Sequence, residues 1–475
     1  MLHRSAVLFV LLAVPSAAVA ADKLPDTVTF AEHVAPIVFA QCADCHRPGQ
    51  VAPFPLLSFE DTKKRAKTSL RVIKDREMPP WQPAAGHGEF QGERRLTDTQ
   101  IALFEKWVKT GMAEGDASKT PAPPKFADGW QLGKPDLIVK MDRSFDVPAD
   151  GPDLYQNFVF PLNLKEDKWV TAVEFQATAP TVVHHVLYFT DDGGRGRESE
   201  AKVAKGKTDA PPGFPGMGFR PSGALGGWAV GAMPVKLPDG LAMPLPKGAD
   251  LVLQTHFHPS GKAEKETLTV GLYFADKAPK RTLHRLSLPP AFGLFSQVDI
   301  PAGKADFNVS DEFTLPYDVD LVGAGAHAHY LGKTLSMTGT TPDKKVHKLF
   351  RIDDWNFNWQ GQYLYKEFVR LPKGTVLRGE VTWDNSRDNV RNPSNPPVRV
   401  TWGEGTGDEM GSVGLMLVAA DEKDSDKLKQ AIRQHTLETV IRSRLRGDEI
   451  DFERLGLPVP PVWKSSPPKK GGGGR

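Results

Sequence analysis

The sequence predicts a multidomain protein in which a small all-α domain is followed by two all-β sandwich domains. At 475 residues the chain has room for about three domains, because one domain takes roughly 100–200 residues. A helical pattern extends from about Asp22 to Met112, and short apolar runs between Gly/Pro turns follow it. We therefore assign residues 1–20 to a signal peptide, 22–117 to the helical domain, 118–128 to a linker, 129–290 and 291–455 to the sandwiches, and 456–475 to a disordered tail.

The first twenty residues have the three regions of a secretory signal peptide. His3 and Arg4 precede an apolar run from Ala6 to Val14, and Ala18-Val19-Ala20 supplies the small residues of a cleavage site. An uncleaved membrane anchor is the alternative, although the apolar run is short for one. No later apolar stretch approaches the roughly 20 residues of a spanning helix, so we expect a periplasmic or secreted protein without a stable membrane span.

The charge of the chain argues against a nucleic-acid partner. Lys and Arg number 60 and Asp and Glu 58, which leaves no extended basic field of the kind that DNA or RNA binding needs. Only two cysteines occur, Cys42 and Cys45, and both lie in one short motif. The rest of this exported chain must therefore be held together by its core rather than by disulfides.

Three helices are expected in the first domain. The first spans Ala31 to Gln41. Ser58 and Thr97 are each followed three residues later by a polar residue that suits a capping box, which places helix starts at both positions. The second helix should end near Asp75 and the third near Gly111.

Two groups of strands follow the Pro- and Lys-rich linker, with a boundary between them near residues 288–295. The predicted strands of the first group are 136–139, 170–177, 182–189, 251–257 and 268–274, and those of the second are 307–315, 319–330, 376–383, 398–402 and 413–419.

The motif Cys42-Ala43-Asp44-Cys45-His46 predicts covalently bound haem c. Two thiols three positions apart can form thioethers with the haem vinyl groups, and the adjacent His46 can become the proximal iron ligand. A thioredoxin-like redox pair and half of a zinc site are the alternatives. The first requires a βαβ context and the second requires further ligands nearby.

Met78 is the predicted sixth ligand of the haem iron. A methionine there raises the reduction potential and suits electron transfer. The segment Glu77-Met78-Pro79-Pro80-Trp81 resembles the Met-Pro-Pro-Trp segment of small class I-type cytochromes c, which implies that the helical domain is a cytochrome c domain with Met78 as distal ligand. Met112 and His87 stay open as distal ligands, and Met78 could instead fill the core.

Beyond the haem motif the histidines are clustered: His184-His185, then His256-Phe257-His258, then His327-Ala328-His329. By chance, 13 histidines in a chain of this length give about 0.4 pairs at any one spacing, so three pairs favour a functional role, such as metal binding, over coincidence. Residues two apart on a strand point to the same face, and adjacent residues point to opposite faces unless a strand end or bulge intervenes. The alternative for each pair is an ordinary hydrogen-bonded core or edge histidine.

Imidazoles suit copper, zinc or iron, whereas a thioether is a soft ligand that favours Cu(I). Met410 follows Asp408-Glu409 at the start of a predicted strand, where a turn could direct its sulfur toward a metal. Taken alone, Met410 would more often be a packing residue.

The order His-His, Thr-His-Phe-His, His-Ala-His-Tyr-Leu-Gly-Lys and Asp-Glu-Met is similar to that of the copper type II, ascorbate-dependent monooxygenases, the group of dopamine β-hydroxylase and peptidylglycine α-hydroxylating monooxygenase. The similarity spans roughly residues 135–420. It implies two jelly-roll-like sandwiches that face each other across an open cleft, with one copper ion on each.

The resemblance also implies the ligands and their roles. One copper, held by His184, His185 and His256, would store and pass an electron; the other, held by His327, His329 and Met410, would bind O2 and abstract hydrogen from a C–H bond of the substrate. His258 is not needed by the pattern. The animal enzymes rely on disulfides, which this chain lacks in the copper region, and on ascorbate.

The expected function is therefore that of an exported copper monooxygenase, which uses O2, two copper ions and haem c to hydroxylate a small organic substrate of unknown identity. Ascorbate or a redox protein would donate the electrons, and the fused haem could deliver them. A periplasmic copper-binding or electron-transfer protein without hydroxylase activity is the alternative. A haem protein joined to a carbohydrate- or partner-binding sandwich is a third possibility and requires no copper.

Two further segments are candidates for contact with the substrate or with the haem domain. A strand over Trp355-Asn356-Phe357-Asn358-Trp359-Gln360 would have one aromatic face and could line the cleft, or be an ordinary half-buried strand. The long Gly-rich stretch from Asp191 to Gly227 could form a docking surface or a flexible loop.

Overall fold

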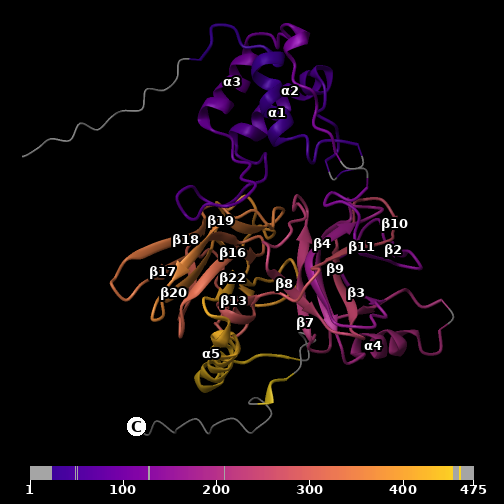
Figure 1. The fold of residues 1–475 in the computed structure, drawn as a ribbon, viewed down its shortest axis with the longest axis vertical. Coiled ribbons are helices and arrows are strands. Elements are labelled where there is room, and N and C mark those ends of the chain that lie inside the picture. Colours follow the sequence, from indigo (N-terminus) through magenta and orange to yellow (C-terminus); the bar gives the residue numbers. More distant parts are fainter. Residues whose placement is uncertain are drawn as a thin grey trace, which may run out of the picture. The chain divides into compact units, whose positions relative to one another are not determined.

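The computed structural model describes residues 24–48, 50, 52–126, 129–207, 209–452 and 459–461. The predicted signal peptide lies outside the described residues, as does the predicted tail apart from residues 459–461. The chain is mostly β-sheet, with several sheets packed in sandwiches and few helices (Figure 1).

The chain divides into two compact units. The first comprises residues 1–44, 55–79 and 96–124, and the second comprises 45–54, 80–95 and 125–475. The helices of the first unit are η1 (Phe30–Val34), α1 (Ala35–Gln41), α2 (Phe59–Lys74), α3 (Asp98–Lys109) and η2 (Ala117–Lys119).

Local sequence signals set the helix starts of the first unit. The Ser58 side chain accepts a hydrogen bond from the backbone N–H of Asp61, and Thr97 and Gln100 form a complete capping box. The caps satisfy backbone donors that would otherwise lack partners at the helix N-termini. Inside the unit, the Trp107 ring packs against Phe30 and Phe104 at centroid distances of 6.2 and 5.6 Å.

The segment 80–95 belongs to the second unit, although the sequence placed it in the helical domain. Pro83 and Phe90 form isolated β-bridges with Ile352 and Tyr365. The Phe90 side chain is 2% exposed and stacks on Tyr365 with ring centroids 4.9 Å apart. Burial of this aromatic residue in a distant core is a tertiary effect that local periodicity does not record.

The first sandwich has two five-stranded sheets around one apolar core. One sheet has the order β1 (Leu137–Lys140), β11 (Thr269–Phe274), β4 (Lys168–Gln176), β8 (Leu241–Leu245), β12 (Arg281–Thr282). The other has the order β6 (Phe214–Pro215), β3 (Leu154–Pro161), β9 (Asp250–Phe257), β5 (Val183–Asp191), β7 (Gly223–Ala229). A short ribbon pairs β2 (Phe145–Val147) with β10 (Glu264–Glu266).

The second sandwich has two four-stranded sheets around a larger core. One has the order β13 (His284–Leu288), β22 (Gly411–Ala419), β16 (Val319–Ala328), β19 (Gln362–Leu371). The other has the order β15 (Phe307–Thr314), β20 (Val376–Trp383), β17 (Gly332–Thr340), β18 (Val346–Ile352). Short elements complete it: β14 (Asp299–Ile300), β21 (Val400–Thr401), η3 (Pro290–Gly293) and η4 (Glu422–Asp424). Because β13 pairs with β22, the second sandwich begins before the predicted boundary.

Two helices were not expected from the sequence. Helix α4 (Arg195–Ala204) lies within the stretch that was predicted to be a long loop, and α5 (Ser425–Arg446) follows the last strand. In α5 the buried residues include His435, Thr439 and Ser443 as well as Leu428. The buried face is therefore not a continuous apolar stripe, which is the pattern that would have predicted a helix.

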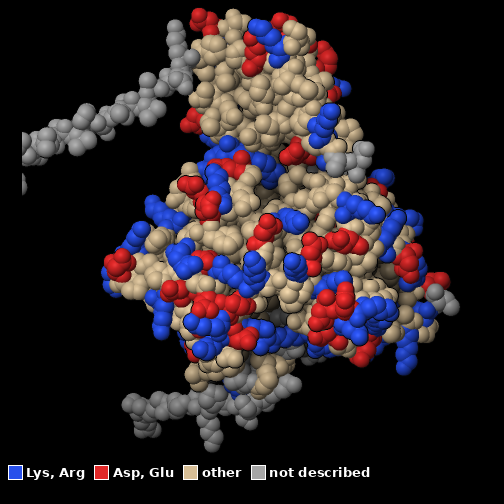
Figure 2. All heavy atoms as spheres, in the orientation of Figure 1, with Lys and Arg blue, Asp and Glu red and all other residues tan. Residues whose placement is uncertain are grey.

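Acidic and basic side chains are interspersed over the second unit on the face drawn in Figure 2. On this face, the mixing of charges produces no extended region of purely positive or purely negative electrostatic potential. Among the described residues, no helix is both long enough and apolar enough to cross a membrane.

Candidate metal centres

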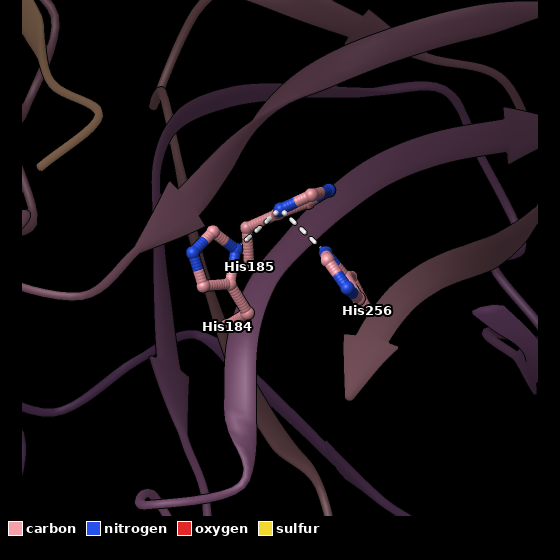
Figure 3. Close-up of side chains that lie close together, drawn as sticks. All are labelled: His184, His185 and His256. Carbon is pink, nitrogen blue, oxygen red and sulfur yellow. Dashed lines mark hydrogen bonds between the residues drawn. The ribbon is translucent and has the colours of Figure 1, made fainter. Parts of the chain in front are cut away.

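The first candidate centre lies where β5 and β9 of the first sandwich run side by side. Val183 pairs with Phe257 and His185 pairs with His256, so β5 has one residue more than β9 between these two pairs. This β-bulge removes the conflict noted for adjacent histidines, because the extra residue, His184, is freed from strict alternation. His184, His185 and His256 therefore converge on one point (Figure 3).

The spacing of the ring nitrogens suits a shared ion. The Nδ1 of His185 lies 3.1 Å from the Nδ1 of His184 and 3.4 Å from the Nδ1 of His256. Nitrogens bound at about 2.0 Å to one tetrahedral or trigonal metal ion are roughly 3.3–3.5 Å apart. Within the described part of the chain, the Nε2 of His184 is buried and has no hydrogen-bond partner, which disfavours a purely structural histidine.

Burial keeps the imidazoles of His184 and His185 neutral, which is the form that binds metals. It lowers the pKa of His184 to about 3 and lowers the pKa of His185 well below its ordinary value, with a further lowering by the neighbouring histidines. Two neutral rings of the cluster therefore have a lone pair available for a metal ion.

Asp153 fixes the orientation of His256. The Nε2–H of His256 donates to Asp153 Oδ2 at 2.8 Å, and the Nδ1–H of His258 donates to Asp153 Oδ1 at 2.7 Å. Since the Nε2 proton of His256 is engaged, its Nδ1 is left with the lone pair that faces His185. The Tyr155 ring stacks on His256 at 4.3 Å. His258 thus supports Asp153 rather than joining the cluster.

The second candidate centre lies at one end of the β13-β22-β16-β19 sheet. His327 is on β16 opposite Ser412 of β22, and the next pair is Ala328 with Gly411. Continuing this antiparallel register places Met410 opposite His329. Residues two apart and residues paired in register share a face, so the backbone puts His327, His329 and Met410 together.

Hydrogen bonds leave one nitrogen of each second-centre histidine available. The Nδ1–H of His327 donates to Gln360 Oε1 at 2.6 Å, and the Nδ1–H of His329 donates to the Asp408 carbonyl at 3.0 Å. The lone pairs therefore lie on the two Nε2 atoms. Burial lowers the pKa of His327 to about 4 and that of His329 to about 3, so both rings are neutral. The Met410 side chain is 8% exposed.

Glu409 anchors the backbone around this centre. Its carboxylate accepts hydrogen bonds from the backbone N–H groups of His329 and Leu331 and from the indole N–H of Trp383. Burial raises the pKa of Glu409 to about 8, against the effect of these donors. Because Glu409 precedes Met410, these hydrogen bonds join the backbone before Met410 to the backbone of His329.

Phe357 occupies the space between the two centres. Its ring stacks on His184 at 4.4 Å, lies 5.5 Å from the His329 ring and is 2% exposed. The expectation of an open cleft is therefore wrong at this point. The expected strand over residues 355–360 is also wrong, because the segment is a turn between β18 and β19. Trp355 packs beneath the second centre and donates its indole N–H to the His329 carbonyl.

The residues predicted to attach haem lie at the end of a short helix. Cys42 is the C-cap of α1, and Cys45 and His46 follow in a turn. The Nδ1–H of His46 donates to the Phe54 carbonyl at 3.0 Å, and burial lowers the pKa of this imidazole. A proximal haem histidine requires a neutral ring whose Nδ1–H is held and whose Nε2 is available, so the chemistry of His46 fits.

The three candidates for the sixth iron ligand stay predictions. Met78 follows α2 and is half-buried, and its backbone N–H donates to the Val72 carbonyl. His87 is half-buried, with its Nδ1–H donating to the Ala85 carbonyl. Met112 has a left-handed backbone with φ 58°.

Asp153 was missed in the sequence, because it is a single polar residue in a turn with no spacing relation to the histidines. Phe357 and Gln360 lie in the segment that was singled out as a possible lining of the cleft, but their contacts with the histidines were not predicted. Glu409 carried a signal, because it precedes the predicted ligand Met410.

Comparisons with known proteins do not identify a family. No family model and no curated protein match the chain. PNGase F, a glycosylasparaginase from Flavobacterium meningosepticum, is 12% identical over 60% of this chain and 96% of its own, with a TM-score of 0.27. The VP2 subviral particle of infectious bursal disease virus is 8% identical over 62% of this chain and 74% of its own, with a TM-score of 0.18. The major capsid protein P2 of bacteriophage PM2 is 9% identical over 57% of this chain and 99% of its own, with a TM-score of 0.22. Values this low support no argument about fold or activity.

Proposed function

We propose that the chain is an exported copper-dependent monooxygenase that hydroxylates a C–H bond of an organic substrate with O2. One observation supports this most. Two unlike donor sets, three imidazoles on one sandwich and two imidazoles with a thioether on the other, approach a single buried ring, Phe357. A storage protein for one metal would not need two chemically different sites.

The residues divide the work by their chemistry. His184, His185 and His256 form an all-nitrogen set on adjacent strands, which suits electron storage. His327, His329 and Met410 include a soft sulfur ligand, which favours Cu(I). Copper, when bound, supplies one-electron chemistry and O2 activation. In the overall reaction one oxygen atom enters the substrate and the other leaves as water, with two electrons and two protons consumed.

We also propose that residues 22–117 contribute a cytochrome c domain, with haem attached at Cys42 and Cys45 and His46 as proximal ligand. Phe54 orients this histidine through its carbonyl. Covalent fusion raises the effective concentration of an electron donor near the copper sites, so a redox protein or ascorbate could reduce the haem first.

The decisive experiment is the metal content of the purified full chain. We expect two copper ions and one haem per chain, one copper ion in His184→Ala, and one in Met410→Ala with loss of the Cu(I)–sulfur scattering in X-ray absorption. His258→Ala is the matched control and keeps both ions, because His258 reaches Asp153 rather than the cluster.

The outcomes separate the candidate functions. Two copper ions together with O2 uptake that depends on an organic substrate support the monooxygenase. Two copper ions with no substrate-dependent uptake across a broad screen would leave a copper-binding or electron-transfer protein. A wild-type chain that binds no copper after reconstitution would refute both and leave a haem protein with a binding sandwich.

A further inference from the structure

Residues 80–95, called the strap from here on, lie along the two edge strands of the second sandwich. The backbone N–H of Ala84 donates to the Arg351 carbonyl of β18 at 2.7 Å, and the backbone N–H of Gln91 donates to the Leu364 carbonyl of β19 at 2.8 Å. β18 and β19 are each the last strand of their sheet. Because edge strands have backbone groups that no neighbouring strand pairs, the strap completes this side of the sandwich.

The strap also binds the turn that joins β18 to β19. Gln82 Oε1 accepts the backbone N–H of Asn356 at 2.7 Å. Gln82 Nε2 donates to the Asn356 carbonyl at 3.3 Å and to the Trp359 carbonyl. One carboxamide therefore uses its acceptor and its amino group on the same turn. These hydrogen bonds hold the backbone on both sides of Phe357.

The turn carries the two side chains that contact the candidate centres. Gln360 Oε1 accepts the Nδ1–H of His327 at 2.6 Å, and Gln360 Nε2 donates to the Phe357 carbonyl at 3.1 Å. The Phe357 ring stacks on His184. Because Gln360 directly follows Trp359, a hydrogen bond that fixes the Trp359 carbonyl also fixes the backbone from which the Gln360 side chain projects.

The other end of the strap contacts the first sandwich. Arg94 Nη2 donates to the Gly231 carbonyl at 3.2 Å. Gly231 has a φ of 80°, and a Cβ added there would lie 2.9 Å from the Trp359 ring, so glycine permits this close approach. Gly231 lies two residues after Ala229, which pairs with His185. The strap thus contacts both sandwiches near their candidate centres.

We propose that the strap is part of the second centre and that Gln82 is a positioning residue. It holds the turn so that Gln360 Oε1 faces the Nδ1–H of His327, which keeps the Nε2 lone pair of His327 available to copper. The strap precedes the linker in the sequence, so the two sandwiches alone lack a segment that their metal chemistry requires. The role at copper rests on the proposed function, whereas the hold on the turn does not.

The first test is hydrogen–deuterium exchange of the full chain before copper is added, with mass spectrometry of peptides that cover the turn. Gln82→Ala removes the acceptor of the Asn356 N–H, so we expect exchange there to become about 10-fold faster, the effect of one lost hydrogen bond. Gln82→Glu keeps an oxygen acceptor but loses the donors, and should fall between Gln82→Ala and the wild type.

Gln91→Ala is the matched control. It alters the same type of residue in the same strap, but the Gln91 side chain donates to the Tyr365 carbonyl rather than to the turn. Exchange of the turn should therefore stay as in the wild type. Circular dichroism and urea unfolding verify that each variant folds.

The second test has two readouts at the second centre. In a His184→Ala background, Gln82→Ala should weaken Cu(I) binding by about 3- to 10-fold, less than the loss of a direct partner of the histidine, because Gln82 acts through Gln360. In the copper-free chain, the imidazole nitrogen NMR signals of His327 should change from one tautomer, protonated at Nδ1, to a mixture. Gln91→Ala should change neither readout, and a purely structural role of Gln82 would lower the urea midpoint without changing the tautomer.

The results separate this inference from the proposed function. A Gln82→Ala chain whose turn exchanges like the wild type would overturn the hold on the turn. Faster exchange with an unchanged His327 tautomer and unchanged Cu(I) affinity would overturn the positioning role. If the wild type binds no copper, the monooxygenase is refuted, and a mixture of His327 tautomers in Gln82→Ala would still support the inference while a single tautomer would overturn it.

Discussion

Replacing Asp153 with Ala should weaken copper binding at the three-histidine centre without touching any ligand. In the wild type the Asp153 carboxylate holds the Nε2–H of His256, and this leaves the lone pair on Nδ1, toward His185. Although burial opposes ionisation, hydrogen bonds from His256 and His258 lower the pKa of Asp153, so the acceptor is a carboxylate at neutral pH. Without it, His256 can move its proton to Nδ1 and block the metal.

The magnitude follows from the geometry. The His256 side chain is 1% exposed, and loss of such a supporting carboxylate typically costs 10- to 100-fold in metal affinity. This corresponds to about 1.4 to 2.7 kcal/mol. Asp153→Asn keeps one oxygen acceptor and should fall between the wild type and Asp153→Ala.

The assay is a competitive Cu(I) titration against a colorimetric chelator, carried out on Asp153→Ala and two controls. His258→Ala removes the exposed partner of Asp153 and should change the affinity less than about 3-fold. Asp311→Ala breaks the contact with His435 elsewhere on the second sandwich and should not change copper affinity. An Asp153→Ala chain with wild-type affinity at both sites would refute the tautomer argument.

Three further predictions concern other parts of the second sandwich. Gln360→Leu removes the acceptor of the His327 Nδ1–H and should weaken copper at the second centre by about 10-fold in a His184→Ala background; unchanged affinity there would contradict the assigned hydrogen bond. Glu409→Ala leaves three buried N–H donors without an acceptor and should lower the free energy of unfolding by roughly 3 to 6 kcal/mol in urea titrations, so a loss under about 1 kcal/mol would be inconsistent with the network. Burial acts to raise the pKa of Asp320, but hydrogen bonds from two arginines lower it below its ordinary value. The stability that this carboxylate provides is therefore present above about pH 4 and is lost as the pH falls further. Asp320→Asn should flatten the change in unfolding midpoint between about pH 5 and pH 3.

Sequence patterns predicted the positions of helices and strands better than they predicted which of them pack or pair together. The expected strand over Val376 to Trp383 has the same bounds in the structure, and the helix caps at Ser58 and Thr97 are present. These features depend on residues within a few positions of one another. Strands β7, β8 and β19 were missed, because Gly, Pro or charged residues interrupt their apolar alternation.

The adjacent pair His184-His185 shows the limit of periodicity. Alternation alone places the two rings on opposite faces of a strand, and only the pairing of β5 with β9 shows the bulge that brings them together. A bulge depends on how many residues the partner strand has between two pairs, and the partner, β9, lies about 70 residues further along the chain.

The sequence by itself determined the types of donor atom, their order along the chain and the local elements that carry them, because spacing and composition act over short ranges. Only the tertiary structure decided which donors meet, that Asp153, Gln360 and Glu409 hold them, and that Phe357 lies between the two centres. The physical reason is that burial and hydrogen-bond partners are set by the packing of sheets, which joins residues far apart in the chain.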